Sequence, residues 1–265
     1  MLREPAVAGT FYEKDVPALK KHISRYITEK KEKYKSKAIV VPHAGYIYSG
    51  AVAGEVYSSV IIPDILIILG PNHTGAGKPI SIMTEGAWRT PLGDVKINEP
   101  LANEIIKKCS VASKDVHAHL REHSIEVQLP FLQYIKKSFS FIPIVLGEYN
   151  INNLQSLSES IATVFRDKEV LLIASTDLTH YEDAASAKEK DTLVLKTIEK
   201  LDEEEMLKHV EDNDISMCGW MPTFVTIRAA KLLGATKGVI IKYMNSGDVS
   251  GDYNQVVGYG GAALI

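Results

Sequence analysis

The sequence has few cysteines and no long apolar run. Its two cysteines, Cys109 and Cys218, form no CxxC pair, which argues against a disulfide scaffold and against a structural zinc cluster. The longest apolar stretch, residues 61–69, is broken by Pro63 and Asp64 and falls far short of the roughly 20 residues that a membrane span requires. The first residues carry charges and no apolar core, unlike a secretory signal. We therefore expect a cytoplasmic protein that does not enter a membrane.

Basic charge is not in surplus either. The chain has 33 acidic and 30 basic side chains, with a formal net charge of −3, so few lysines and arginines are left over to neutralise a phosphate backbone. We expect no nucleic-acid partner. No stretch is rich enough in proline, glycine or serine to be a linker, and no repeat is visible. Because 265 residues suffice for one sizeable core, we predict a single domain over residues 1–265.

Three common catalytic or nucleotide-binding motifs are missing. No GxSxG elbow occurs, and no GxGxxG follows a strand. Gly70 and Gly75 have the spacing of a P-loop, but Ala76 stands at the position of its lysine. The sequence therefore contains no signature of a serine hydrolase or of a nucleotide-binding loop.

What the sequence does contain is an alternation of short β-branched runs with amphipathic segments. Apolar residues recur at three- and four-residue steps between Asp15 and Lys30, which predicts a first helix. The segment 80–97 holds turn residues and favours antiparallel additions, and the glycine-rich tail favours a last strand. Continuous apolar runs predict buried strands at residues 38–41, 65–69, 141–145, 170–174 and 239–243. This pattern predicts an α/β fold with a mostly parallel central sheet covered by helices on both faces.

Histidines follow three of the predicted strands. The run AIVV leads into His43, the run ILIIL leads into His73, and the run VLLIA leads into Asp177 and His180. Ligands of open α/β sheets bind outside the carboxyl ends of the strands. If the three strands are parallel, these four side chains converge in one pocket.

Such a cluster favours metal binding or acid–base catalysis over loop packing. A single histidine in a loop is more often a hydrogen-bonded structural residue, but histidines at several matching junctions favour function, because imidazole is the commonest metal ligand and titrates near neutral pH. Cys218, in the segment SMCGWMP, is a candidate thiolate ligand, whereas Cys109 is assigned to packing. Two histidines and a cysteine suit iron, copper or zinc and leave positions open for a substrate.

A competing pattern lies at residues 119–123. The letters HLREH match the H-x-x-E-H motif of zinc peptidases, which places two histidines one helical turn apart. That interpretation needs a long helix around His119 and His123, and the preceding residues show little helical periodicity. We rank the peptidase below the histidine cluster at the strand ends.

Seven ordered motifs carry a family resemblance. They are AGTFY, PHAGYIYSG, GPNHTG, RTPLGD, EHSIEVQLPFL, STDLTHY and MCGWMP, and together they resemble the MEMO family over almost the whole chain. The resemblance implies a fold similar to that of class III extradiol ring-cleaving dioxygenases and one metal site. It implies that His43, His73 and Cys218 are metal ligands, that Asp177 and His180 lie beside them, and that Glu122 and His123 line the pocket.

These observations lead to one main hypothesis and one alternative. In the first, the protein holds a single iron(II) or copper ion, with zinc as a further option, and performs redox or dioxygenase-like chemistry on a small or aromatic substrate. His180 would act as general base, and Asp177 would hold its tautomer if the loop forms a helical turn. The dioxygenases complete their iron site with a carboxylate, whereas the third ligand here would be the thiolate of Cys218. Because a thiolate changes the properties of the bound metal, ring cleavage does not follow from the fold.

In the alternative, the same pocket is a non-enzymatic site for a ligand or peptide. The resemblance also implies AMMECR1-type and radical-SAM proteins as partners.

Overall fold

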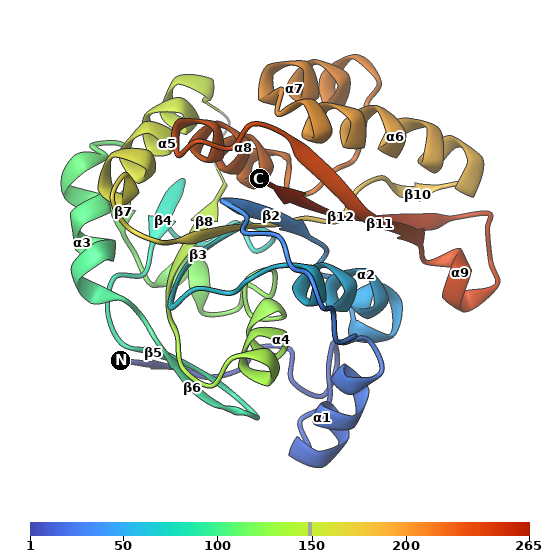
Figure 1. Cartoon of the computed structure of the whole chain (residues 1–265), viewed down its shortest axis with the longest axis horizontal. Helices are drawn as coiled ribbons and strands as arrows, with labels where there is room; N and C mark the ends of the chain where they lie inside the picture. The colour runs from blue at the N-terminus through green and yellow to red at the C-terminus, as the bar shows by residue number, and fades with distance from the viewer. Residues whose placement is uncertain (148–149) are drawn as a thin grey trace.

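The computed structural model describes residues 1–147 and 150–265, which form an α/β fold around one central sheet (Figure 1). The strand order is β10-β12-β2-β9-β3-β8-β4-β7, and β11 pairs with β12 outside this path. The strands of this sheet are β2 (Ala38–Val41), β3 (Ile65–Pro71), β4 (Ile80–Ile82), β7 (Ser113–Lys114), β8 (Ser140–Leu146), β9 (Leu171–Ser175), β10 (His180–Glu182), β11 (Gly238–Asn245) and β12 (Val256–Leu264).

The middle of the sheet is parallel, as predicted. Strands β2, β9, β3 and β8 lie side by side in parallel, and nearly all of their residues are buried, because both faces are covered by helices. Antiparallel strands flank this group, with β12 on β2 and β4 on β8. The predicted α/β fold is therefore confirmed.

The antiparallel additions expected over residues 80–97 are divided between two sheets. Strand β4 joins the central sheet, whereas β5 (Ala87–Thr90) and β6 (Gly93–Lys96) form a hairpin that β1 (Leu2–Arg3) extends into a separate sheet. The start of the chain completes this small sheet, a pairing that no local pattern in residues 80–97 indicates.

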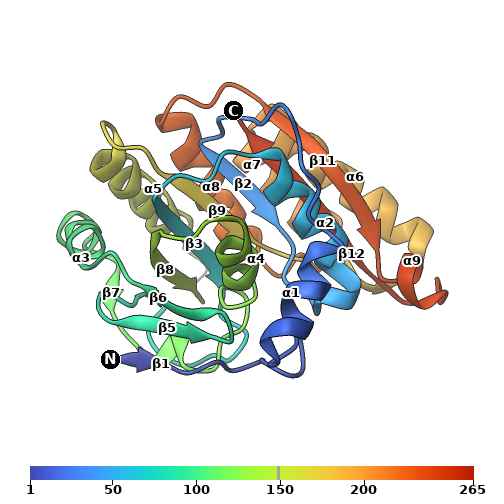
Figure 2. The same ribbon diagram turned by 60° about the horizontal axis from the view of Figure 1, so that its bottom comes forward.

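Helices cover both faces of the central sheet. Figure 2 shows α1, α2 and α4 in front of the strands, with α6, α7 and α8 behind them. The helices are α1 (Val16–Ser24), α2 (Tyr46–Ser59), α3 (Glu99–Lys108), α4 (Gln128–Ile135), α5 (Ile151–Phe165), α6 (Ala184–Lys200), α7 (Glu203–Asp212), α8 (Trp220–Leu232) and α9 (Gly247–Ser250), with a 3₁₀ turn at His117–His119. None of the helices in the described ranges has the length and apolarity needed to span a bilayer.

The first helix is shorter than the predicted segment. Asp15 caps α1 by accepting a hydrogen bond from the amide of Ala18, and the helix ends six residues before Lys30. Beyond that end, Tyr26 packs against α2, where added Cβ atoms at Gly50 and Gly54 would lie 2.4 and 2.5 Å from it. Tyr26 thus packs closely against the two glycines of α2 just beyond the end of the helix.

Candidate metal centre

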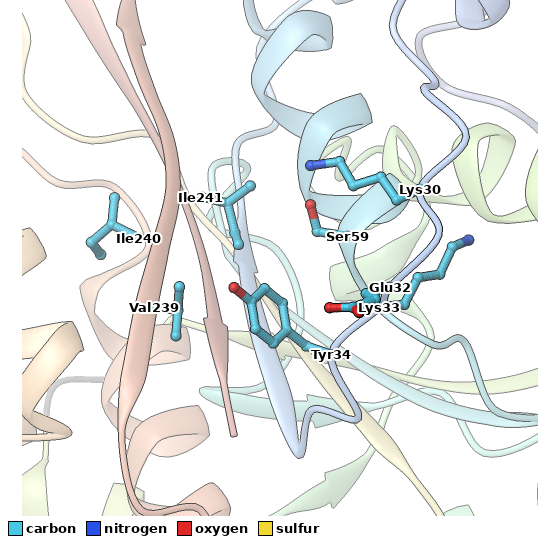
Figure 3. A pocket seen from close by; sticks show the side chains of 8 residues that line it. All are labelled: Lys30, Glu32, Lys33, Tyr34, Ser59, Val239, Ile240 and Ile241. Atoms are coloured by element: carbon cyan, nitrogen blue, oxygen red, sulfur yellow. The ribbon is translucent and has the colours of Figure 1, made fainter.

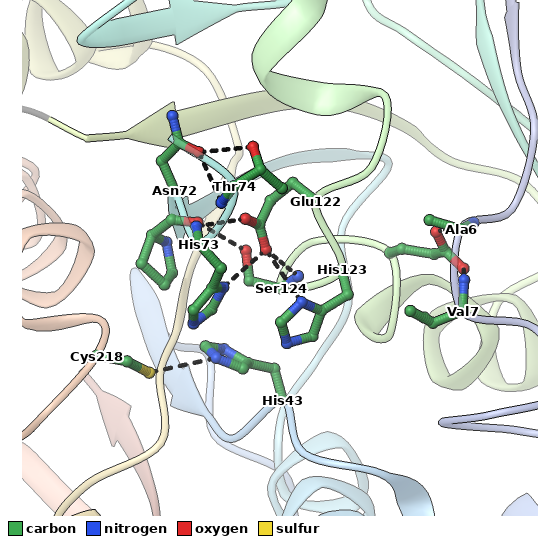
Figure 4. Close-up of polar contacts among 12 residues, drawn as sticks. Ala6, Val7, His43, Asn72, His73, Thr74, Glu122, His123, Ser124 and Cys218 are labelled. Carbon is green, nitrogen blue, oxygen red and sulfur yellow. Dashed lines mark hydrogen bonds and ion pairs between the residues drawn. The ribbon is translucent and has the colours of Figure 1, made fainter. Parts of the chain in front are cut away.

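The carboxyl ends of the parallel strands bring distant side chains together. His43 follows β2, His73 follows β3, and Cys218 lies in the turn before α8. One ligand atom from each of these three residues lies within 4.8 Å of the others, and Nε2 of His43 is 3.3 Å from Sγ of Cys218 (Figure 4). The structure thus groups the three residues that were predicted to be metal ligands, and this grouping depends on the parallel order of the strands.

The ring of His43 is held in one tautomer. Its Nδ1 lies 3.0 Å from Oγ of Ser175. That hydroxyl donates its own proton to the carbonyl of Ser124 at 2.6 Å and accepts from the side-chain amide of Gln128 at 2.8 Å, so it accepts from His43 as well. Nδ1 therefore carries the proton, and the lone pair of Nε2 faces Cys218. Burial keeps this ring neutral by lowering its pKa well below 6.5.

Glu122 orients the second imidazole. One carboxylate oxygen accepts from the backbone amide of His73 at 2.6 Å, and the other accepts from its Nδ1 at 2.9 Å and from the amide of Ser124 at 2.8 Å. Burial alone would raise the pKa of Glu122, but these hydrogen bonds and the nearby imidazoles outweigh it and lower the pKa to about 2. An ionised carboxylate on Nδ1 leaves Nε2 of His73 as the free donor, as in carboxylate–histidine–metal arrangements.

A third imidazole adjoins the first two. The ring of His123 stacks on His73 with centroids 4.6 Å apart and meets His43 edge-on at 5.4 Å. Phe11 lies against its other side, 4.8 Å away. Burial lowers the pKa of His123. The set of His73, Glu122 and His123 also has its ligand atoms within 4.8 Å, but Glu122 is fully buried and lies behind His73 as its hydrogen-bond partner.

The surroundings of Cys218 favour the protonated form of its thiol. Burial, followed by the charge of Asp177, raises its pKa well above the ordinary value. Two acceptors are in reach of its proton, Nε2 of His43 at 3.3 Å and the carbonyl of Asp177 at 3.6 Å, while the amide of Asp177 donates to the sulfur at 3.3 Å. A metal ion would replace this proton, because the thiolate is the ligand form of cysteine.

The expected hydrogen bond between Asp177 and His180 is not formed. Residues 176–179 are not helical and β10 begins at His180, so the two side chains do not share the face of a helical turn. Asp177 instead accepts from the backbone amide of His43 at 2.8 Å, and burial raises its pKa to about 6. The predicted role of Asp177 in fixing the tautomer of His180 is therefore wrong.

The tautomer of His180 is set by a different residue. Its Nδ1 lies 2.9 Å from the carbonyl oxygen of Ser216, which can only accept, so Nδ1 carries the proton and Nε2 is left as a proton acceptor. The hydroxyl of Ser216 also accepts from the backbone amide of His180 at 2.7 Å. A positive charge on the ring of His180 would lower the pKa of both His43 and Asp177, so this ring interacts electrostatically with both residues.

Several residues that build the centre carry no recognisable sequence signal. Ser175 and Gln128 orient His43, Ser216 orients His180, and Asp191 of α6 accepts from the amide of Thr179 at 2.9 Å. Ser175, Gln128 and Ser216 act through contacts between residues 36 or more positions apart, whereas Asp191 is only 12 residues from Thr179. Their only sequence cue is a polar residue inside an otherwise apolar segment, as at Gln128 before LPFL and at Ser175 after VLLIA.

The peptidase interpretation of HLREH is wrong. Residues 120–123 are not helical, so the two histidines are not one helical turn apart. His119 is fully buried, and its ring packs edge-on against Trp88 with centroids 5.8 Å apart. It belongs to the core between the small sheet and the loop that leads to Glu122.

Burial of His119 predicts a pH-dependent stability. Burial lowers its pKa from 6.5 to about 4, so between these values the unfolded chain binds a proton that the folded chain does not, and the free energy of unfolding falls as the pH falls. In His119→Leu, we expect the loss of stability between pH 7 and pH 4.5 to be smaller than in the wild type by about 2 kcal/mol. Urea unfolding at both pH values measures this difference. An equal loss in both proteins would contradict the prediction.

Comparison with known proteins places the chain in a family. Residues 3–263 match the family model described as Memo-like protein. The chain belongs to the MEMO family. It is 47% identical over 266 residues to a MEMO1 family protein of Aquifex aeolicus, covering 100% of this chain and 99% of the relative. It is 45% identical over 281 residues to a MEMO1 family protein of Methanopyrus kandleri, with the same coverage.

A solved structure shares the fold at low identity. The crystal structure of an uncharacterized protein from Escherichia coli K12 superposes with a TM-score of 0.60, covering 86% of this chain and 100% of that one, at 12% identity. The α/β fold of this MEMO family member thus recurs in a chain with little sequence similarity.

Proposed function

We propose that the protein holds one iron or copper ion between His43, His73 and Cys218, and that it performs redox or dioxygenase-like chemistry on a small or aromatic substrate. One observation carries the proposal: two imidazoles whose Nδ1 atoms are already hydrogen-bonded converge on one thiol. Nitrogen and sulfur donors suit iron, copper and zinc, and three protein ligands leave coordination positions open.

In this proposal, some residues around the three ligands position the histidines, and another accepts a proton. A bound iron or copper ion would supply redox chemistry at the open positions. Glu122 holds His73, Ser175 holds His43, and the carboxylate of Asp177 holds the backbone of His43. His180 is the proton acceptor, because its Nδ1 is committed to the carbonyl of Ser216 and its Nε2 is free.

Metal content is the first test. Protein purified without chelators should contain close to one equivalent of iron or copper by elemental analysis, and His43→Ala, His73→Ala and Cys218→Ala should each lose it. His22→Ala is the matched control, since this histidine lies on α1 and pairs with Glu13, and it should keep the metal. A native protein that stays metal-free after loading would contradict the proposal and leave ligand binding as the use of the pocket.

Substitution of His180 separates metal binding from catalysis. Because His180 is not one of the three donors, we expect His180→Ala to keep its metal and to lose turnover by about 100-fold or more, measured as oxygen consumption with a panel of catechols. Parallel loss of metal and turnover in His180→Ala would show that this residue is not a separate base.

A further inference from the structure

An edge of the central sheet has no partner strand. Strand β11 pairs with β12 on one side, and no strand pairs with its other side in residues 1–147 and 150–265 (Figures 1 and 2). Residues 238–244 are all partly exposed. An edge of this length offers backbone amides and carbonyls to another chain, and proteins usually protect such edges with charges or a covering segment.

A cavity of about 460 Å³ lies against the first half of this edge. Its apolar wall is Val239, Ile240 and Ile241, and the facing wall comes from the segment before β2 and from the end of α2 (Figure 3). The residues of the facing wall are Lys30, Glu32, Lys33, Tyr34 and Ser59. The volume suits a few side chains of a bound peptide.

The cavity lies at the opposite end of the sheet from the metal centre. Gly238 pairs with Leu264, and Leu264 pairs with Ala38, the first residue of β2. His43 follows the last residue of that strand. A ligand at this edge would therefore bind independently of the metal.

The segment that contributes Lys30 and Lys33 to the cavity is rich in lysine. Residues 30–37 contain five lysines and one glutamate. Lys30 pairs with Glu55 and Lys35 pairs with Glu169. In contrast, the lysines at positions 31, 33 and 37, and Lys242 on β11 itself, form no ion pair with any residue that the structure describes. The excess positive charge here contrasts with the net charge of −3 for the whole chain.

We propose that β11 binds an extended acidic segment of a partner protein as an additional strand. The backbone of the segment would pair with the free edge. Apolar side chains on one face of the segment would enter the cavity beside Ile241, and carboxylates on the same face, further along the segment, would lie near Lys33 and Lys242. This is β-strand addition, in which backbone hydrogen bonds supply affinity and alternating side chains supply specificity. The unpaired lysines favour a partner segment that carries negative charge.

A second copy of this chain is the less suitable occupant. Antiparallel pairing of two β11 strands would place the second half of one strand against the first half of the other. Lys242 of one copy would then lie beside the lysine-rich segment 30–37 of the other, where like charges repel. An acidic strand makes the same backbone contacts without this repulsion.

The test uses a fluorescein-labelled peptide as long as β11. The positions of one face carry valine in one half and glutamate in the other half, and threonine occupies the positions between them. We expect binding by fluorescence anisotropy, slowed amide hydrogen exchange confined to β11 and its flanks, and weaker binding at high salt. The double variant Lys33→Glu/Lys242→Glu should raise the Kd by about tenfold or more. Lys107→Glu, an exposed lysine on α3, is the matched control and should leave the Kd unchanged, as should His73→Ala.

Four outcomes would overturn the inference. They are no binding of the glutamate peptide up to millimolar concentration, equal binding of a peptide with lysine in place of glutamate, an unchanged Kd in the double variant, and binding without protection of β11 amides. Concentration-dependent dimers that protect β11 would also overturn it, since the occupant would then be a second copy. None of these outcomes depends on whether the metal centre is active.

Discussion

Replacing Arg3 with methionine is expected to lower the free energy of unfolding by about 3–5 kcal/mol. Arg3 is buried and forms an ion pair with the fully buried Glu126. Its guanidinium also donates to the carbonyl of His119 at 3.0 Å and to that of Glu122 at 2.6 Å, and it lies 4.3 Å from the ring centroid of Trp88. The substitution leaves the carboxylate of Glu126 buried without its cation. An uncompensated buried charge strongly lowers the free energy of unfolding.

Arg89→Met is the matched control for this experiment. Arg89 also forms ion pairs, with Glu4 and Asp94, but its side chain is 45% exposed, so solvent screening limits its contribution to about 1 kcal/mol or less. Urea unfolding of both variants at neutral pH gives the comparison. A similar loss in the two variants would show that the buried ion pair does not dominate stability here.

The Arg3 pair also connects the start of the chain to the candidate metal site. Glu126 accepts from the amides of Ala6 and Val7 and from the hydroxyl of Tyr12. The carbonyl of Glu122 is held by Arg3, and its carboxylate holds His73. We therefore expect Arg3→Met to weaken metal binding as well as folding, because the loop that carries Glu122 loses its anchor.

Replacing Glu122 with glutamine is expected to lower metal affinity by about 10–100-fold. The substitution keeps the size of the side chain and removes its charge, so the ring of His73 becomes less basic and is less firmly oriented. Competition with a chelator, using zinc as the probe ion, measures the affinity directly. This readout is independent of any catalytic activity.

A second glutamate–histidine pair provides the control. Glu13 lies 2.7 Å from Nδ1 of His22, outside the metal centre, so Glu13→Gln should leave the affinity for zinc unchanged. The free energy of unfolding of metal-free Glu122→Gln must be measured alongside. Unchanged affinity in Glu122→Gln, with folding intact, would rule out a role for this carboxylate in orienting His73.

The strands and their order were predictable to different degrees. Runs such as ILIIL predict strands that are buried on both faces, because local apolar periodicity reports burial. The periodicity of apolar residues does not show which strands lie next to each other in the sheet. The placement of β9 between β2 and β3 is what brings Ser175 and Asp177 against His43, and this placement depends on long-range packing.

The candidate site shows the same division. The candidate donors His43, His73 and Cys218 were identifiable from strand ends and motifs, because histidine and cysteine are chemically distinctive. The positions of the protons on the two imidazole rings could not be predicted from the sequence. They depend on Ser175, 132 residues from His43, and on Glu122, 49 residues from His73. The helical turn at Asp177 is absent because tertiary hydrogen bonds override the local pattern in that segment. The helix that the peptidase interpretation of HLREH requires is also absent, which agrees with the weak helical periodicity of the preceding residues.

Composition and local pattern were thus sufficient to predict the α/β class, the buried strands and the MEMO resemblance, and to propose three candidate donors, because each of these depends on residue type and on spacing along the chain. Tertiary structure alone decided which strands are neighbours, which nitrogen of each imidazole is free, and where the edge of the sheet lies open. These features arise from contacts between segments that are far apart in sequence, and such contacts leave no periodic signal in either segment.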